Sequence, residues 1–140
     1  MDFAVETEAA AAPERVFALL EAGDRWSSWA GPFVPRSSWK VPGDPVGGVG
    51  AVRRLGLGPL SSLERVTAHE APNRLSYVVD SPAPYRGYAS TVTLTPTPSG
   101  GTAISWRSSF EPIVPGTGPV LRWLLRAVVG SFARNLARRA

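Results

Sequence analysis

The spacing of apolar residues changes period along the chain, and this change limits the folds that the sequence can adopt. From Pro35 to Phe110 apolar and polar residues alternate, which is the period of a β-strand with one buried face. From Gly118 to Ala140 apolar residues recur with the 3.6-residue period of an amphipathic helix. The 14 glycines and 14 prolines make up a fifth of the 140 residues and disfavour a bundle of long helices. An α+β fold with a helix after the sheet is therefore expected.

Turn signals divide the alternating segment into short strands. Segments such as Pro-Gly-Asp-Pro and Pro-Ser-Gly-Gly recur between the apolar runs and predict tight connections. Because short connections favour pairing between consecutive strands, an antiparallel meander is expected. The expected strands lie at residues 2–8, 37–41, 50–57, 62–69, 74–80, 88–95 and 102–110.

Two short helices are expected between the first strand and the second. Pro13 and Glu14 suit the first turn of one helix, and Trp26 and Trp29 would share a face of the next. A curved sheet around the long terminal helix would then bury every apolar face. The sequence therefore predicts a single α+β domain over residues 1–140, in which a curved seven-stranded antiparallel sheet wraps a long C-terminal helix.

The inner face of this sheet is expected to carry two charged residues. If a turn at Gly58-Pro59 pairs Leu55 with Ser62, Arg53 lies opposite Glu64 and both side chains point inward. A closed core avoids ionised groups, whereas large aromatic rings with a few polar tips are typical of a small-molecule cavity. We therefore predict a cavity for a hydrophobic small molecule between the sheet and the C-terminal helix. Its predicted ligand-binding residues are Trp39, Val66, Tyr77, Val79, Tyr88, Ser90, Val92, Trp106, Ser108, Phe110, Leu124 and Val128.

The roles of the polar residues on this face stay open. Arg53 and Glu64 can serve as an oxyanion-stabilising cation and a general acid or base, which makes them the candidate catalytic pair. Alternatively they form a half-exposed structural ion pair. Tyr77 and Tyr88 can donate hydrogen bonds to a ligand or act as core aromatics at the rim. His69 is expected on the outward face, exposed and without a chemical role.

Six motifs are distributed along almost the whole chain. They are Ala11-Ala-Pro-Glu-Arg-Val-Phe-Ala-Leu-Leu20, Trp26-Ser-Ser-Trp29, Pro45-Val-Gly-Gly-Val-Gly-Ala-Val-Arg53, Glu64-Arg-Val66, Pro72-Asn-Arg-Leu-Ser-Tyr77 and Thr102-Ala-Ile-Ser-Trp106. Together they resemble the START-like, or SRPBCC, superfamily, and most closely its polyketide cyclase/dehydrase and lipid-transport proteins. The resemblance implies the helix-grip fold and binding of a lipid, aromatic or polyketide-like molecule, with cyclase or dehydratase activity as the alternative. It assigns no catalytic residue, because the superfamily shares no short catalytic signature.

Composition excludes several classes of site. The chain lacks cysteine, which excludes disulfides and thiolate chemistry, and a single histidine excludes multi-histidine metal sites. We expect neither a metal nor a cofactor. No apolar run approaches the ~20 residues that span a bilayer, and no signal-peptide pattern opens the chain, so a cytoplasmic location is expected. The richness in Arg, Ala, Gly and Pro is typical of a bacterial protein with a high-GC genome.

Positive charge gathers near the C-terminus. The net charge is +4, and five arginines fall in the last 19 residues. They are Arg122, Arg126, Arg134, Arg138 and Arg139. Such a helix can lie on an anionic membrane or bind a protein partner, but the same pattern is typical of a gripped helix with a solvated back, which we favour. No groove-reading module accompanies the charge, so nucleic acid is not expected as a partner.

Overall fold

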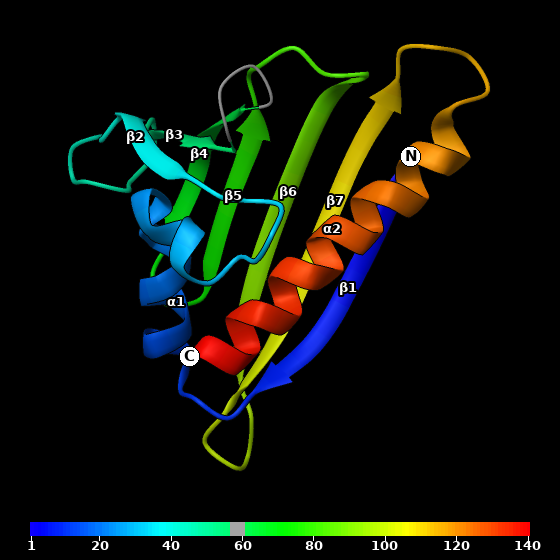
Figure 1. The fold of residues 1–140 in the computed structure, drawn as a ribbon. Coiled ribbons are helices and arrows are strands. Elements are labelled where there is room, and N and C mark those ends of the chain that lie inside the picture. The colour runs from blue at the N-terminus through cyan, green and yellow to red at the C-terminus, as the bar shows by residue number, and fades with distance from the viewer. Residues whose placement is uncertain (57–60) are drawn as a thin grey trace.

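The chain forms a curved sheet with its helices on the concave side (Figure 1). The computed structural model describes residues 1–56 and 61–140. Two α-helices and one short 3₁₀ helix, η1, accompany seven strands in the described residues. In chain order the elements are β1 (Asp2–Ala9), α1 (Pro13–Glu21), η1 (Gly23–Ser28), β2 (Ser37–Val41), β3 (Val52–Leu55), β4 (Ser62–Glu70), β5 (Arg74–Val79), β6 (Tyr85–Pro96), β7 (Thr102–Pro112) and α2 (Gly118–Arg139).

The strands form one antiparallel sheet in the order β1-β7-β6-β5-β4-β3-β2. From β2 to β7 each strand pairs with its neighbour in sequence, which confirms the predicted meander. β1 pairs with β7, so β1 and β2 lie at opposite edges, and α1 and η1 lie on the path between them. α2 crosses the concave face and packs mainly on β1 and β7 (Figure 1). The predicted fold class, with its long terminal helix and two short helices, is therefore confirmed.

Strands β1, β4, β5 and β7 end one or two residues from their predicted bounds, and β3 and β6 also begin at a different residue. β6 begins at Tyr85 rather than at residue 88, because its first residues pair with the end of β7 ahead of a bulge. β3 begins at Val52 rather than at residue 50. The predicted end of this strand at residue 57 and the predicted turn at Gly58-Pro59 lie outside the described residues.

A bulge in β4 reverses the predicted direction of His69. The register of β4 against β5 shifts just after Val66, so His69 pairs with the buried Leu75 and faces the inside of the sheet. The His69 ring meets the Phe17 ring edge-on, with centroids 5.2 Å apart, and its Nε2 lies 2.8 Å from a carboxylate oxygen of Glu21. The expectation of an exposed, outward His69 was therefore wrong, because strict alternation does not hold across a bulge.

The two halves of α2 differ in how they are packed. In the C-terminal half Val129, Phe132 and Leu136 are buried against the sheet, as the helical period predicts. In the N-terminal half Val120 and Leu124 are exposed, although the period placed both on the buried side. The prediction of one continuous buried face was wrong for this half, because α2 rests on β1 and β7 and leaves the opposite side of its first turns uncovered.

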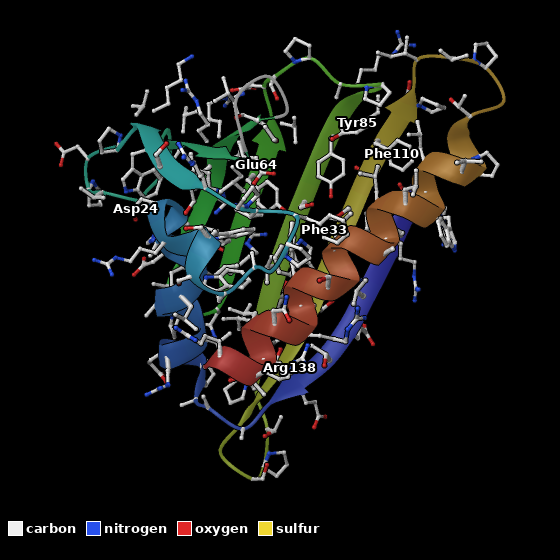
Figure 2. The ribbon with its side chains drawn as sticks, in the orientation of Figure 1. Asp24, Phe33, Glu64, Tyr85, Phe110 and Arg138 are labelled. Atoms are coloured by element: carbon white, nitrogen blue, oxygen red, sulfur yellow. The ribbon has the colours of Figure 1, made fainter. Side chains whose placement is uncertain are left out.

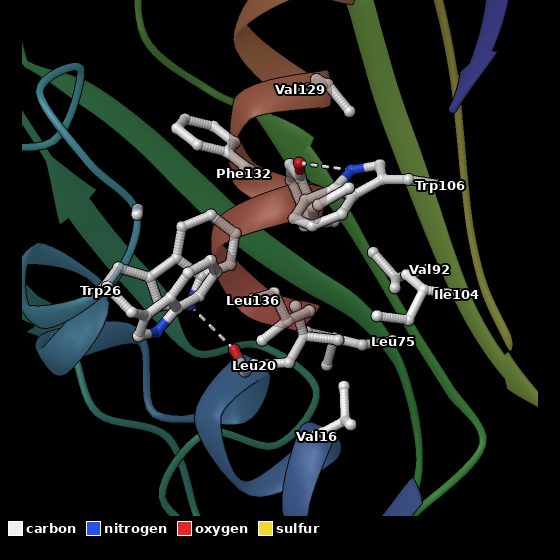
Figure 3. Packing of buried hydrophobic residues seen from close by; sticks show 14 of the residues in the cluster. Val16, Leu20, Trp26, Leu75, Val92, Ile104, Trp106, Val129, Phe132 and Leu136 are labelled. Atoms are coloured by element: carbon white, nitrogen blue, oxygen red, sulfur yellow. Dashed lines mark hydrogen bonds between the residues drawn. The ribbon is translucent and has the colours of Figure 1, made fainter. Parts of the chain in front are cut away.

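A buried tryptophan forms the centre of the core. The Trp26 ring centroid lies 4.8 Å from that of Trp29, 5.9 Å from that of Trp106 and 5.6 Å from that of Phe132. The indole Nε1 of Trp26 donates a hydrogen bond of 2.9 Å to the carbonyl oxygen of Leu20. Figure 3 shows this aromatic cluster continuing into a layer of aliphatic side chains between the sheet, α1 and α2. The packing joins η1, β7 and α2 and so fixes the walls of the site.

Candidate functional site

The register of β3 against β4 brings the predicted charged pair together. Leu55 pairs with Ser62 and Arg53 with Glu64, as predicted. Arg53 Nε donates a hydrogen bond of 3.1 Å to Glu64 Oε1, and Arg53 Nη2 lies 3.0 Å from the same oxygen. The exposed fractions of the two side chains are 1% and 10%, so the interpretation as a half-exposed pair was wrong. The ion pair is a buried one.

Aromatic rings enclose the Arg53 guanidinium. Its Cζ lies 4.0 Å from the centroid of the Trp26 ring and 4.5 Å from that of Tyr77, both within the range of a cation–π interaction. Gly23 permits this approach, because a Cβ there would lie 2.8 Å from Arg53 Cδ and 2.9 Å from the Trp39 ring. Although Arg53 Nη2 lies 3.0 Å from Glu64 Oε1, the geometry is not that of a hydrogen bond, and Nη2 has no other partner within the described residues. The cation is thus held by rings and a single carboxylate.

Burial raises the pKa of the Glu64 carboxyl above its ordinary value, and the charge and hydrogen bond of Arg53 oppose this shift without cancelling it. The hydrogen bond from Arg53 goes to Oε1, and no hydrogen bond within the described residues reaches Oε2. Glu64 also lines the cavity beneath α2. The carboxyl can therefore exchange a proton or a hydrogen bond with a molecule in that cavity.

A cavity of about 200 Å³ lies between the sheet and α2. Its walls come from β3 to β6, from the segment after η1 and from the middle of α2. The lining residues are Phe33, Val34, Leu55, Ser62, Glu64, Tyr77, Val79, Tyr85, Tyr88, Leu125, Val128, Val129 and Phe132. Figure 2 shows Phe33, Glu64 and Tyr85 on the side of the sheet that α2 covers. Of the predicted site residues, Glu64, Tyr77, Val79, Tyr88 and Val128 meet at this cavity.

Three predicted residues form a buried cluster of hydroxyl groups. The Tyr88 hydroxyl donates a hydrogen bond of 3.2 Å to Ser108 Oγ and accepts one of 3.2 Å from Ser90. The oxygens of Ser90 and Ser108 lie 2.6 Å apart. Burial raises the pKa of the Tyr88 hydroxyl to about 12, because its hydrogen bonds with the two serines only partly oppose the loss of water. Tyr88 is therefore neutral at physiological pH.

The hydroxyl group of Tyr77 is held by a hydrogen bond within the core. Its hydroxyl oxygen accepts a hydrogen bond of 3.2 Å from Trp106 Nε1. Burial raises the pKa of the Tyr77 hydroxyl well above its ordinary value, and the nearby Glu64 charge adds to this effect. Burial also raises the pKa of Tyr85, so the three tyrosines that line the cavity all carry neutral hydroxyl groups, in contrast to the carboxyl beside them.

The other predicted ligand-binding residues lie away from the described cavity lining. Val66, Val92 and Trp106 belong to the solid core, and the Phe110 ring packs edge-on against that of Phe3. Leu124 is exposed. Trp39 packs beside Gly23, and Arg53 contacts the cavity through Glu64. Their predicted roles toward a ligand stay predictions.

Three lining residues, Phe33, Val34 and Tyr85, had no signal in the sequence. Phe33 and Val34 belong to the connection between η1 and β2, where no periodicity predicts a direction. Tyr85 precedes the predicted start of its strand, and the bulge in β6 separates it from the alternation that follows. Leu125, Val129 and Phe132 fall on the apolar side of the terminal helix, where the helical period places them.

The whole sequence, residues 1–140, matches the family described as "Polyketide cyclase / dehydrase and lipid transport". The chain belongs to this family. No curated protein matches the sequence. The polyketide cyclase/dehydrase and lipid-transport family takes in both enzymes and carriers, so membership leaves the reaction or ligand of this chain undetermined.

Solved structures show the same helix-grip fold in other organisms. A START superfamily protein from Mycobacterium smegmatis matches with a TM-score of 0.83 at 13% identity, over 99% of this chain and 95% of that one. An uncharacterized protein from Bacillus thuringiensis matches with a TM-score of 0.80 at 20% identity, over 99% and 98% of the two chains. Norcoclaurine synthase from Thalictrum flavum matches with a TM-score of 0.76 at 14% identity, over 99% and 92%. At these identities the likeness establishes the fold alone.

Two further findings concern the described residues of this family member. No helix within residues 1–56 and 61–140 is long and apolar enough to cross a membrane. The same part of the chain contains no group of three or more metal-ligating side chains. The side chains that line the cavity supply one carboxyl, tyrosine and serine hydroxyls and apolar surface.

Proposed function

We propose that this member of the polyketide cyclase/dehydrase and lipid-transport family binds a small, mostly apolar molecule in the cavity beneath α2. The observation that carries the proposal is a buried carboxyl, Glu64, in a wall made mostly of aromatic and aliphatic side chains. Burial of a carboxyl has an energetic cost that one arginine only partly offsets. A ligand that hydrogen-bonds to Glu64 would offset more of that cost, and rings around it would bind the apolar part.

The size of the cavity restricts the ligand. At about 30 Å³ per water molecule, 200 Å³ corresponds to roughly seven waters, which is the volume of a single substituted ring. A polycyclic or long-chain molecule would require the N-terminal half of α2 to move. Burying about 200 Å² of ring surface contributes about 5 kcal/mol before the cost of association. A Kd of 1 mM already corresponds to about 4.1 kcal/mol of net binding free energy, so we expect dissociation constants of roughly 1 mM or weaker for single-ring probes.

Ligand-detected NMR with benzylamine, phenol and benzoate as probes tests the proposal. Benzylamine and phenol, which can donate a hydrogen bond to Glu64, should bind, whereas the benzoate anion should be excluded by the carboxylate. Val128→Phe would fill the cavity from α2 and should abolish binding. Ala127→Phe, on the exposed neighbouring position of the same helix, is the matched control and should bind normally. Equal binding by the two variants, or no binding of any probe to the unmodified chain, would refute the proposal.

A second candidate function is proton transfer on an enolisable ketone, as a cyclase or dehydratase requires. The specific observation in its favour is the raised pKa of Glu64, which brings the carboxyl closer to the working range of a general acid or base. Neutral Tyr77 and Tyr88 hydroxyls on the same wall are potential donors to an enolate oxygen. Arg53 would act as a positioning residue, because it holds Oε1 and leaves Oε2 for the substrate.

Exchange of the α-protons of benzylacetone in D2O, followed by proton NMR, measures this step directly. The ionised Glu64 would take a proton from the carbon next to the carbonyl, and return of a deuteron from the exchanged carboxyl would complete the exchange. Glu64→Gln should reduce the protein-dependent exchange rate to background while phenol still binds. Unchanged exchange in this variant would exclude Glu64 as the base and leave the carrier function standing.

A further inference from the structure

The outward side of the N-terminal half of α2 is apolar. Val120, Trp123, Leu124 and Ala127 follow the i, i+3, i+4, i+7 spacing of one helix face, and all four are exposed. The exposed fractions of the first three are 61%, 69% and 46%. These four residues are called the helix patch below. A helix whose other side rests on a sheet should carry polar residues on this side, so the burial of α2 on the sheet does not explain the patch.

The exposure of the helix patch continues into the segment that precedes α2. Ile113 and Val114 are exposed by 53% and 56%. Thr117, just before the helix, donates its hydroxyl to the Val114 carbonyl oxygen at 2.6 Å, which ties this segment to the start of α2. Apolar side chains are thus exposed on both the helix and its leading segment, on the end of the molecule away from α1 (Figure 1).

The charge around the helix patch has one sign. From residue 112 to residue 140 the sequence has five arginines and neither aspartate nor glutamate. Arg126 lies three residues after Trp123 and so borders the patch, whereas Arg122 Nε donates a hydrogen bond of 2.8 Å to the Asp2 carbonyl oxygen of β1. Glu111, the last acidic residue of the sequence, has its Oε2 3.8 Å from Arg86 Nε. A cation therefore borders the apolar face.

We propose that the helix patch docks on an anionic lipid bilayer, with Trp123 at the level of the headgroups and Arg126 facing acidic phospholipids. An exposed indole on an apolar helix face flanked by arginines is the residue pattern of helices that lie in the membrane interface. Charge complementarity selects this occupant over a second copy of the chain, because a two-fold contact through the patch would oppose arginines to arginines. The patch is small and its charges are exposed, so the attachment is reversible and weakens as salt rises.

Cosedimentation of the full chain with vesicles tests the docking. One set of vesicles contains equal parts of phosphatidylcholine and phosphatidylserine, and the other contains phosphatidylcholine alone. At low salt the chain should sediment with the first set and remain in solution with the second. Trp123→Ser should weaken binding about tenfold, which is the effect of removing one half-buried indole. Arg126→Glu should weaken it about fivefold or more, through loss of one attraction and gain of one repulsion.

Matched controls separate docking from general stickiness. Val46→Ser removes an equally exposed apolar side chain from the β2–β3 connection, and Arg15→Glu reverses an exposed charge on α1. Both should bind vesicles as the unmodified chain does. Failure of the unmodified chain to sediment with anionic vesicles, or equal binding by Trp123→Ser, would overturn the proposal. So would a monomer–dimer equilibrium that Trp123→Ser abolishes, which would assign the patch to a second copy. Probe binding in the cavity is measured without lipid, so the two proposals fail independently.

Discussion

Replacement of Arg53 by methionine isolates the energetic role of the buried ion pair. Methionine keeps the unbranched stem of the side chain but removes the guanidinium that faces Glu64 and lies over the Trp26 and Tyr77 rings. Breaking a buried pair by removing one partner costs about 3–5 kcal/mol, because the other charge remains without compensation. We therefore expect Arg53→Met to lower the free energy of unfolding by about 3–5 kcal/mol at about pH 8, a large part of the 5–15 kcal/mol typical of a domain.

The loss should shrink as the pH falls. Burial already raises the folded-state pKa of Glu64, and removal of Arg53 eliminates the two effects that oppose this rise. A group whose pKa is raised on folding binds protons more tightly in the folded state, so stability increases as the pH falls through the folded-state pKa toward the unfolded-state value. One carboxyl can change the free energy of unfolding by at most about 1.4 kcal/mol per pH unit. Between about pH 8 and pH 5 much of the Arg53→Met deficit should disappear.

Urea unfolding followed by tryptophan fluorescence measures these differences. The double variant Arg53→Met/Glu64→Leu should recover most of the stability at both pH values, since apolar replacement of a buried pair is often neutral. Arg65→Met is the matched control, because Arg65 in β4 pairs with Asp80, just after β5, at 46% and 39% exposure and should cost at most about 1 kcal/mol. A deficit of Arg53→Met that is independent of pH, or that the double variant retains in full, would refute the reasoning.

Two further predictions follow from local packing and from the tyrosines. In thermal unfolding, Gly23→Ala should destabilise the chain by about 1–3 kcal/mol, because the new Cβ would lie 2.8 Å from Arg53 Cδ. Gly130→Ala in α2 should instead stabilise the chain by up to about 1 kcal/mol, because the new Cβ meets only the flexible end of an arginine side chain. The pKa of Tyr88 is raised to about 12, so the folded state binds this proton more tightly than the unfolded state does, and stability should fall as the pH rises from about 10 to 12. Unfolding measured across this pH range should show a shallower fall for Tyr88→Phe.

The sequence was sufficient for the fold because its signals agree along the chain. Alternation, turn residues and the terminal helical period each indicate the same seven strands and helix, and the Arg53–Glu64 register follows from one short connection. His69 shows where such reasoning ends, since one bulge reverses the parity of every residue after it. The cavity lining was predicted only where a residue lies on a regular element, as Tyr77 does. Phe33 belongs to an irregular segment, whose direction depends on tertiary packing.

The path of α2 over the sheet connects the cavity with the exposed side of the helix. α2 rests on β1 and β7 at one edge, so the inner face of β3 to β6 must be covered by other elements. Beside the C-terminal half of α2, η1 covers this face by placing Trp26 between Tyr77, Trp106 and Phe132. The core there is solidly packed. Toward the N-terminal half of α2 the segment around Phe33 lines this face, and a cavity remains beside Glu64. The same half of α2 turns Leu125 toward the cavity and Val120, Trp123 and Leu124 outward, so the cavity and the exposed apolar face lie on two sides of one helix whose other half is anchored by its core contacts.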